Sequence, residues 1–324
     1  MLTYAFRLPP GPKTVAYAVI AEKLGYESVW CPEIPAFGHD IWITLARIAE
    51  RTSRIGVGAS VLIPSYRHAV AQASAIATIE AIAPGRLRAG FGTGFTGRAG
   101  MGKPPLKLAD MRRHIIQVKT LLRGDPVDID GGMAQLLASE GDLPDRPINI
   151  PLLLAAQGPR GRDLAQEVAD GLISMGTAAA GFDTCLVSIN GTVLDEGEDV
   201  TSPRARAALT PLIALAYHFR YTTDPESVQS LPNGEAWLAS VEQVPAAVRH
   251  LSVHRGHTID VSNGHDQLVD VHAAKEMTFT GTKDQLRARL DALEAAGATG
   301  VIFGTSGVDV ERELHAYAEV AGLA

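Results

Sequence analysis

Helical stripes that alternate with short apolar runs dominate the hydrophobic pattern of the chain. Residues 13–24 carry apolar side chains at helical spacing, Gly25 ends this stripe, and the apolar run 28–31 follows. The same succession of stripe, break and apolar run recurs toward the C-terminus. This pattern predicts α-helices alternating with β-strands.

Eight apolar runs are predicted to be strands. They are residues 4–8, 28–31, 55–61, 87–91, 152–155, 172–175, 185–189 and 301–304. Helices are predicted at residues 13–24, 43–49, 67–82, 159–169, 286–296 and 308–321. Near-continuous apolar strands between amphipathic helices are typical of a parallel sheet covered by helices, either open or closed. Eight units favour closure into a (β/α)8 TIM barrel.

Two segments depart from this alternation, one after the fourth predicted strand and one after the seventh. Residues 95–150 contain a possible hairpin turn at Gly131-Gly132, and residues 191–282 are rich in His, Pro and charge. Both add to the roughly 250 residues of a usual barrel. Because barrel sites are formed by loops, we expect both insertions to line a pocket within a single domain over residues 1–324.

Composition narrows the class of protein. The 324 residues are 46% hydrophobic and 20% charged, with a formal net charge of -7, which argues against nucleic acid as a partner. No apolar run reaches the roughly 18 residues of a membrane span, and the first residues do not resemble a secretory signal. Cys31 and Cys185 are the two cysteines, so we expect reduced, buried thiols and a cytoplasmic protein.

A candidate anion site follows the predicted strand 152–155. Gln157, Gly158, Pro159 and Arg160 stand where this strand gives way to a helix. Free N–H groups at a helix start, together with the helix dipole and nearby arginines, favour phosphate. Gly158 and Pro159 could instead serve only to turn the chain into the helix. After the next strand, Gly176-Thr177 could contact the same phosphate or form an ordinary turn.

Glycines also mark the ends of two earlier strands. Around Thr93 and Gly94 the glycine spacing lacks the immediate helix of a dinucleotide-binding fingerprint, so a Rossmann site is disfavoured. These glycines could admit a flat ring close to the backbone, with Thr93 bonding its polar edge, or form a flexible loop. Near Gly58, Ala59 and Ser60, small residues indicate either tight barrel packing or close approach of a ligand.

Several of these motifs, in this order, resemble the luciferase-like monooxygenase superfamily. The segments that support the resemblance are 24–30, 66–68, 84–86, 92–94, 156–159 and 169–171. Within the superfamily the chain is most similar to the methylenetetrahydromethanopterin reductase branch. The resemblance covers about residues 13–190 and resumes at 281–304.

The resemblance implies a (β/α)8 barrel that binds the deazaflavin coenzyme F420, or alternatively FMN. It places Gly58, Ala59 and Ser60 in a bulge behind the ring, often with a non-proline cis peptide bond. It places Thr93 and Gly94 near the ring, and Gly158 with Gly176-Thr177 at the phosphate. Sugar-phosphate dehydrogenases of the family carry Glu where this chain has Phe95, so their acid catalyst at that position is not transferable. Family members commonly form homodimers.

Glu33 and His39 are the candidate catalytic residues, because they follow the second strand at the expected pocket opening. A partly buried His or Glu can supply the proton that accompanies hydride transfer. Glu33 could instead pair with an arginine, and Asp40 fits the N-cap of the helix beginning near Ile41.

Histidines in the second insertion suggest a metal site less strongly. His250 and His254 would share one helical face, with His257 extending the row, but Gly256 interrupts it and no carboxylate ligand is evident. Pocket-lining or surface roles are favoured, and no metal is predicted.

Three functions remain open at this point. The leading one is an enzyme that transfers hydride between F420 and a small organic substrate. The others are an FMN-dependent monooxygenase and a non-catalytic flavin-binding barrel.

Overall fold

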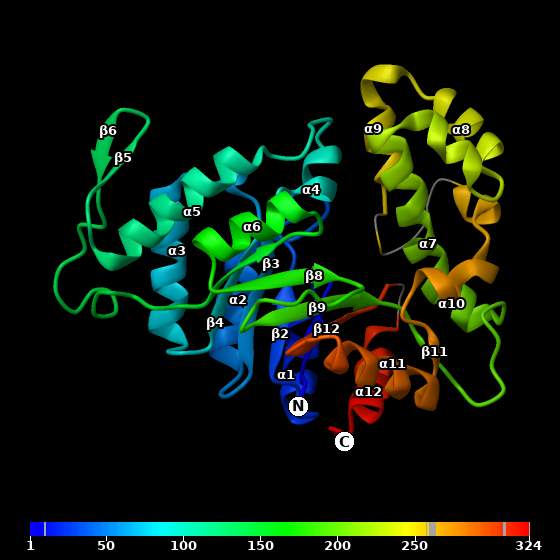
Figure 1. The fold of residues 1–324 in the computed structure, drawn as a ribbon, viewed down its shortest axis with the longest axis horizontal. Coiled ribbons are helices and arrows are strands. Elements are labelled where there is room, and N and C mark those ends of the chain that lie inside the picture. The colour runs from blue at the N-terminus through cyan, green and yellow to red at the C-terminus, as the bar shows by residue number, and fades with distance from the viewer. Residues whose placement is uncertain (10, 257, 259–263, 307–308, 324) are drawn as a thin grey trace.

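A closed barrel of eight parallel strands forms the centre of the structure (Figure 1). The computed structural model describes residues 1–9, 11–256, 258, 264–306 and 309–323. The barrel strands are β1 (Thr3–Arg7), β2 (Ser28–Cys31), β3 (Gly56–Leu62), β4 (Leu87–Phe91), β7 (Leu152–Ala155), β8 (Gly171–Met175), β9 (Cys185–Asn190) and β12 (Gly300–Gly304). Their order around the barrel is β1-β12-β9-β8-β7-β4-β3-β2. The predicted (β/α)8 barrel and its eight strands are confirmed.

Seven helices of the described part of the chain surround the barrel. They are α1 (Thr14–Lys23), α2 (Ile41–Arg51), α3 (Ala69–Ile82), α5 (Leu108–Arg123), α6 (Pro159–Val168), α11 (Lys283–Ala295) and α12 (Val310–Ala321). Asp40 caps α2 as predicted, since its Oδ1 accepts hydrogen bonds from the N–H groups of Trp42 (2.9 Å) and Ile43 (3.2 Å). The predicted last helix begins at Val310, and residues 307 and 308 lie outside the described part of the chain.

The first insertion contains more regular structure than its sequence suggested. It holds α4 (Phe95–Ala99), the barrel helix α5, and a protruding hairpin of β5 (Val127–Ile129) and β6 (Gly132–Ala134) (Figure 1). The predicted turn at Gly131-Gly132 is displaced by one residue, because Gly132 already pairs with Ile129. Asp130 and Gly131 form the turn, both with positive φ, as two-residue hairpins require.

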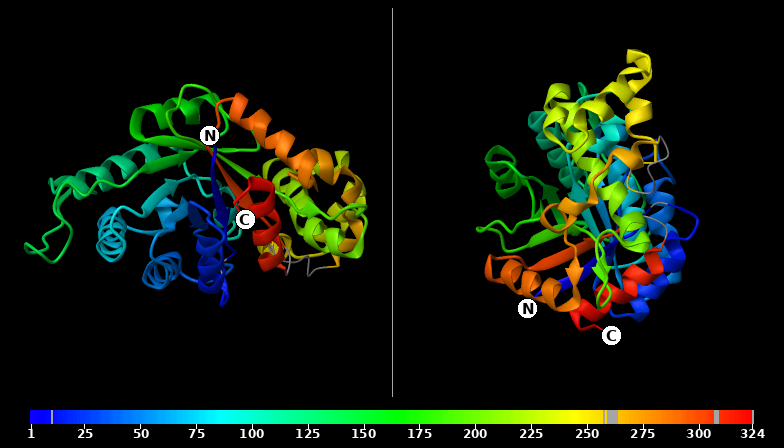
Figure 2. Two further views of the ribbon diagram at one scale, coloured as in Figure 1. Left: turned by 90° about the horizontal axis from the view of Figure 1, so that it is seen from below. Right: turned by 90° about the vertical axis from the view of Figure 1, so that its right-hand side faces the viewer.

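The second insertion forms a helical lobe beside the barrel (Figures 1 and 2). Its elements are β10 (Val193–Leu194), α7 (Pro203–Thr223), α8 (Gly234–Glu242), α9 (Arg249–Val253), α10 (Ala274–Met277) and β11 (Gly281–Thr282), with 3-10 turns at Pro225–Ser230, Ala246–Val248, His265–Leu268 and Val271–Ala273; a further 3-10 turn, Pro64–Tyr66, precedes α3. The lobe has its own apolar core around Leu209, Tyr217 and Trp237. Among the described residues, none of the helices combines the length and hydrophobicity of a transmembrane segment.

Trp30 fills much of the barrel interior. Its side chain is fully buried, and its Nε1 donates a hydrogen bond to Ser28 Oγ at 3.0 Å. A Cβ added to Gly58 would lie 2.3 Å from the Trp30 ring, so close packing accounts for this glycine. Because side chains alternate along a strand, Ala59 points to the helix layer instead, where it is fully buried.

Candidate functional site

Most sequence-predicted site residues gather at one end of the barrel, here called the mouth, where the C-terminal ends of the strands lie. Glu33 follows β2, Ser60 ends the regular part of β3, Thr93 follows β4, Gln157 follows β7, and Gly176 follows β8. These five strands are consecutive neighbours around the barrel. The five loops therefore form one continuous arc, as a barrel site requires.

The β3 part of this arc is irregular. The register between β3 and β4 shifts between Ser60 and Leu62, and the Ser60–Val61 peptide bond is cis. The cis peptide bond matches what the family resemblance implied. The bulge lies at Val61, beyond Gly58 and Ala59, which keep regular pairing with Arg88 and Ala89. A Cβ at Gly92 would lie 2.5 Å from the Val61 side chain, and Gly94 has φ +73° with Ile63 against it. Because Gly92 and Gly94 have no Cβ, the backbone after β4 can lie directly against the side chains of Val61 and Ile63.

Groups suited to an anion lie at the N-terminus of α6. Gly158 is the N-cap, Pro159 opens the helix, and Arg160 is exposed beside it. Arg162 Nε is buried and has no hydrogen-bond partner. The space beside Gly158 is empty, since an added Cβ would meet no atom within 4 Å. Unpaired N–H groups and two arginines at a helix start suit an anion such as phosphate.

The β8 loop lies beside the start of α6. Gln157 Nε2 donates to the carbonyl of Met175 at 3.3 Å, which ties the β7 and β8 ends together. Gly176 has φ +73° and, like Gly158, open space at its Cβ position. Thr177 is exposed next to it. The pair of loops could therefore contact one group from two sides.

Glu33 is the most perturbed carboxyl of the mouth. Its side chain is 5% exposed, and Oε2 accepts a hydrogen bond from the Ile63 N–H at 2.6 Å. Arg67 Nε lies 3.6 Å from Oε1, and the Arg67 guanidinium also pairs with Asp40. Burial raises the pKa of Glu33 to about 7, against the opposing effects of the Ile63 N–H and Arg67. The carboxyl can exchange a proton near neutral pH.

Tyr66 extends this cluster. Its buried hydroxyl has no hydrogen-bond partner, and burial together with the Glu33 charge raises the pKa of the phenol. Tyr66 therefore stays protonated at neutral pH. His39, the other predicted catalytic residue, is exposed on the loop before α2.

The histidines of the second insertion do not form the row on one helical face that their spacing suggested. α9 ends at Val253, so His254 is its C-cap and not a second residue on the helix face. His254 is buried edge-on against His218 with ring centroids 5.4 Å apart, while His250 lies against Gly102. His257 falls outside the described residues. Across the described parts of the chain, no group of three or more His, Cys, Asp or Glu is arranged to hold a metal ion.

Arg7 is a mouth residue that the sequence analysis missed. It ends β1, and its guanidinium donates to Ser188 Oγ at 3.0 Å and bonds Asn190 Oδ1, both on β9. Burial lowers its pKa to about 10, which leaves it charged at neutral pH. An arginine inside an otherwise apolar predicted strand was the available signal.

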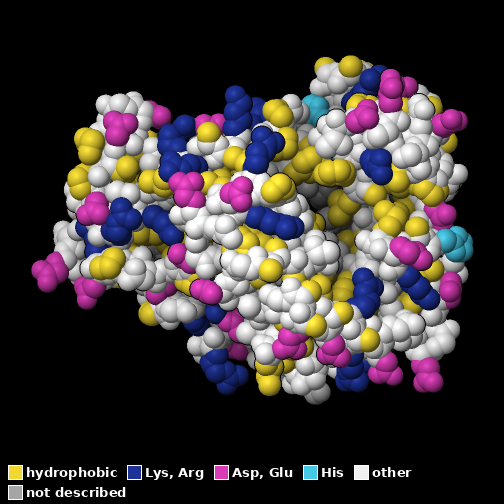
Figure 3. Space-filling view, in the orientation of Figure 1, with side chains coloured by type: hydrophobic (Ala, Val, Ile, Leu, Met, Phe, Trp, Pro, Cys, Tyr) yellow, Lys and Arg dark blue, Asp and Glu magenta, His cyan; other side chains and the backbone are white. Residues whose placement is uncertain are grey.

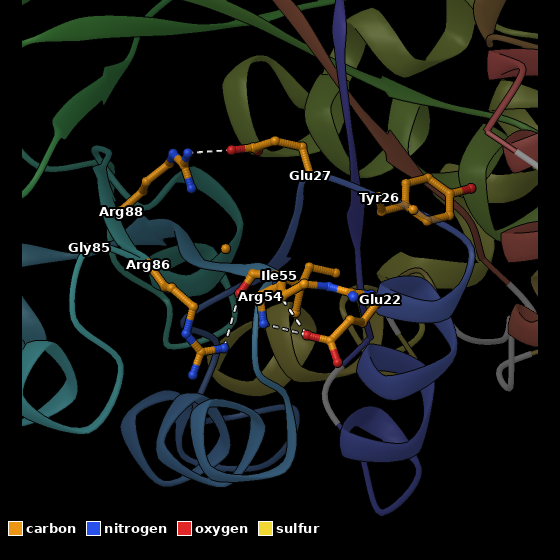
Figure 4. Close-up of a pocket in the computed structure, with 10 residues that line it drawn as sticks. Glu22, Tyr26, Glu27, Arg54, Ile55, Gly85, Arg86 and Arg88 are labelled. Carbon is orange, nitrogen blue, oxygen red and sulfur yellow. Dashed lines mark hydrogen bonds and ion pairs between the residues drawn. The ribbon is translucent and has the colours of Figure 1, made fainter.

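A separate cavity of about 350 Å³ lies at the opposite end of the barrel (Figure 4). Its polar groups bond mainly to one another: Glu22 accepts from three consecutive backbone N–H groups, including that of Arg54 at 2.7 Å. Arg86 donates to backbone carbonyls and Arg88 pairs with Glu27. These bonds fasten the loops that enter β2, β3 and β4, which is a structural role.

The family model for luciferase-like monooxygenases matches residues 7–300. The chain belongs to this family. A curated relative, the F420-dependent glucose-6-phosphate dehydrogenase of Amycolatopsis mediterranei (strain U-32), is 28% identical over 329 residues, which cover 95% of this chain and 93% of the relative.

Solved structures of the same fold include an F420-dependent secondary alcohol dehydrogenase in complex with an F420-acetone adduct, with a TM-score of 0.69 and 17% identity, covering 99% of this chain and 98% of that one. The F420-dependent tetrahydromethanopterin reductase of Methanopyrus kandleri superposes with a TM-score of 0.68 at 19% identity, covering 98% and 97%. Both similarities support the barrel assignment of this family member.

Proposed function

We propose that this protein is an oxidoreductase that transfers hydride between coenzyme F420 and a small organic substrate. The observation that carries the proposal is the continuous arc of loops, with a buried, unpartnered Arg162 Nε at its anion-binding end. The F420-dependent curated relative, similar over nearly the whole chain, supports the choice of deazaflavin over FMN.

The residues of the arc divide into two groups by what they can hold. Gly158, Arg160 and Arg162 at the α6 start, with Gln157, Pro159 and the Gly176-Thr177 loop, suit the phosphate of the cofactor. Ser60, Thr93 and Gly94 border the part of the mouth suited to its flat ring. Gly58 and Ala59 support the arc from below, since both are buried in packing.

Bound F420 supplies the hydride chemistry, and the chain supplies position and a proton. Glu33 holds that proton at its carboxyl, with the buried environment keeping part of the population protonated at neutral pH. His39, exposed on the loop before α2, is the second candidate donor.

Binding of each cofactor to the purified protein tests the proposal. F420 and FMN are titrated separately while their fluorescence is followed, and oxygen uptake is then measured with the reduced cofactor. Saturable binding of F420 with no oxygen uptake is expected. Binding of FMN alone, with oxygen consumption, would instead identify a monooxygenase, and binding of neither would leave a non-catalytic barrel.

We further propose that barrel and insertions act as a single domain in a cytoplasmic homodimer with a small-molecule substrate. The free, buried thiols of Cys31 and Cys185 fit a reducing compartment. Exposed Met133 and Leu137, on and just after the protruding hairpin, are apolar positions that a partner subunit could cover. Sedimentation analysis gives the oligomeric state directly.

A further inference from the structure

Helix α7 stands across the mouth of the barrel. Near its start, the carbonyl of Ala208 accepts a hydrogen bond of 2.7 Å from Ser306 Oγ, just after β12. Further along, the Phe219 ring lies 5.0 Å from that of Phe95, just after β4. In the barrel order, β12 and β4 stand four places apart, on opposite sides. Eleven residues of helix span about 16 Å, so α7 bridges the opening.

One face of α7 is apolar along this span. At 100° per residue, positions 208, 212, 215 and 219 fall within about 60° of one another, and they are Ala, Leu, Leu and Phe. The insertion's own core uses a different face, with Leu209, Ile213 and Tyr217. Leu212, Leu215 and Phe219 do not join that core or the barrel core.

The end of the apolar face at Phe219 borders an open space, whereas Leu212 is buried. Phe219 is 53% exposed although it contacts Phe95, and a hollow edged by hydrophobic side chains separates the barrel from the helical lobe (Figure 3). Exposed aromatic rings at a hollow are typical of ligand sites and are costly to leave in water.

Three arginines around this face are already engaged by the protein. Arg204, at the start of α7, pairs with Glu198 and Glu313. Arg98, next to the Phe95 segment, donates to Ser65 Oγ at 2.6 Å and to the carbonyl of Pro104 at 2.5 Å. Arg7, at the end of β1, bonds Ser188 and Asn190. A charged substrate group could pair with one of these three arginines only by breaking its contacts.

We propose that the substrate is uncharged and mainly apolar, and that Phe95 and Phe219 select it by packing against it. This inference rests on the proposed function for the use of the mouth as the substrate site. It differs in substrate chemistry from the sugar phosphate named for the curated relative.

Two probe compounds with the same ring test the inference: 2-naphthol, which is uncharged at neutral pH, and 2-naphthyl phosphate. Their dissociation constants are measured by calorimetry on the full chain, once with saturating F420 and once with excess inorganic phosphate occupying the anion site. Binding of 2-naphthol at least tenfold tighter than binding of the phosphate ester is expected.

Phe219→Ala should weaken 2-naphthol binding by roughly three- to tenfold, since one aromatic contact is lost. Phe219→Lys should shift the preference toward the phosphate ester. Ile82→Ala, which changes an exposed apolar residue at the end of α3, is the matched control and should change neither constant. Melting temperatures confirm that each variant is folded, and Phe219→Leu replaces any variant that is not.

The inference is overturned if the phosphate ester binds as tightly as 2-naphthol, if neither compound binds, or if folded Phe219 variants bind 2-naphthol like the parent protein. The calorimetric measurement made with excess inorganic phosphate needs no F420. Failure of F420 to bind would therefore contradict the proposed function while leaving the measured preference of this face intact.

Discussion

Glycines of this chain serve two physical purposes, which substitution to alanine can separate. Gly58 lies in a barrel strand where an added Cβ would be 2.3 Å from the Trp30 ring, whereas the nearest atom to a Cβ at Gly132 is 3.7 Å away. The first glycine makes room for a neighbour. The second is a strand residue facing open space.

Gly58→Ala should therefore lower the free energy of unfolding by about 1–3 kcal/mol, the usual cost of overpacking a core. Gly132→Ala should leave it unchanged or raise it slightly, because alanine restricts the unfolded chain. Chemical denaturation of both variants measures the difference. Equal effects would show that Trp30 does not occupy the space beside Gly58.

Glu33 permits a prediction on pH. Its pKa of about 7 means that the protonated form declines as the pH rises through neutrality. If this carboxyl donates the proton, the turnover number for substrate reduction should fall above pH 7. Glu33→Gln should lower turnover by roughly a hundredfold or more. It should also abolish the fall in turnover above pH 7, here called the pH limb.

His39→Gln is the matched comparison for Glu33→Gln, because His39 is exposed on the same loop. Retention of the pH limb in this variant is expected. Loss of the limb in His39→Gln, with its retention in Glu33→Gln, would reverse the two assignments.

Single residues differed in how well the sequence predicted them. Asp40 was predicted as a helix cap because its partners are two and three residues away. Arg7 and Phe219 were missed because their contacts, Asn190 and Phe95, lie more than a hundred residues distant. Glu33 was predicted by position, but its bond to Ile63 depends on how β2 and β3 pair.

At the scale of elements, the N-terminus of α6 is the feature with the clearest ligand preference. Arg162→Ala should weaken F420 binding by about ten- to hundredfold, as expected for the loss of a hydrogen bond to a charged group. It should also reduce the salt dependence of binding. Fluorescence titration at two salt concentrations measures both quantities.

Arg54→Ala is the control for Arg162→Ala, because Arg54 is an exposed arginine at the opposite end of the barrel (Figure 4). It changes the net charge equally and should leave F420 binding unaltered. Equal weakening by both variants would point to general electrostatics instead of a site at α6.

Strands were predicted more completely than helices. Buried parallel strands are short apolar runs between breaks, and all eight could be found from the sequence alone. α5 was missed although Met111, Ile115, Val118 and Leu122 follow helical spacing, because it lies inside a segment that begins with a glycine-rich loop. The helices of the second insertion bury their faces against one another, which no local pattern reveals.

On the scale of the whole molecule, the described residues form three apolar cores, and each of the two larger cores packs against a buried histidine. His114 of α5 lies edge-on to Phe91 in the barrel, and His254 packs against His218 in the helical lobe. Burial, assisted by nearby positive groups, lowers the pKa of each to about 4. Both cores therefore favour the neutral imidazole.

Acid should consequently destabilise the whole molecule. The unfolded chain takes up these protons near pH 6.5, while the folded protein resists until about pH 4. The stability that the neutral imidazoles contribute is complete above pH 6.5 and is lost progressively as the pH falls toward 4.

His254→Gln should reduce the loss of unfolding free energy between pH 7 and 4.5, measured by denaturant titration. His272→Gln, an exposed position in the same lobe, should leave that loss unchanged. If both variants kept the parent's full pH dependence, the burial of His254 would not contribute to acid sensitivity.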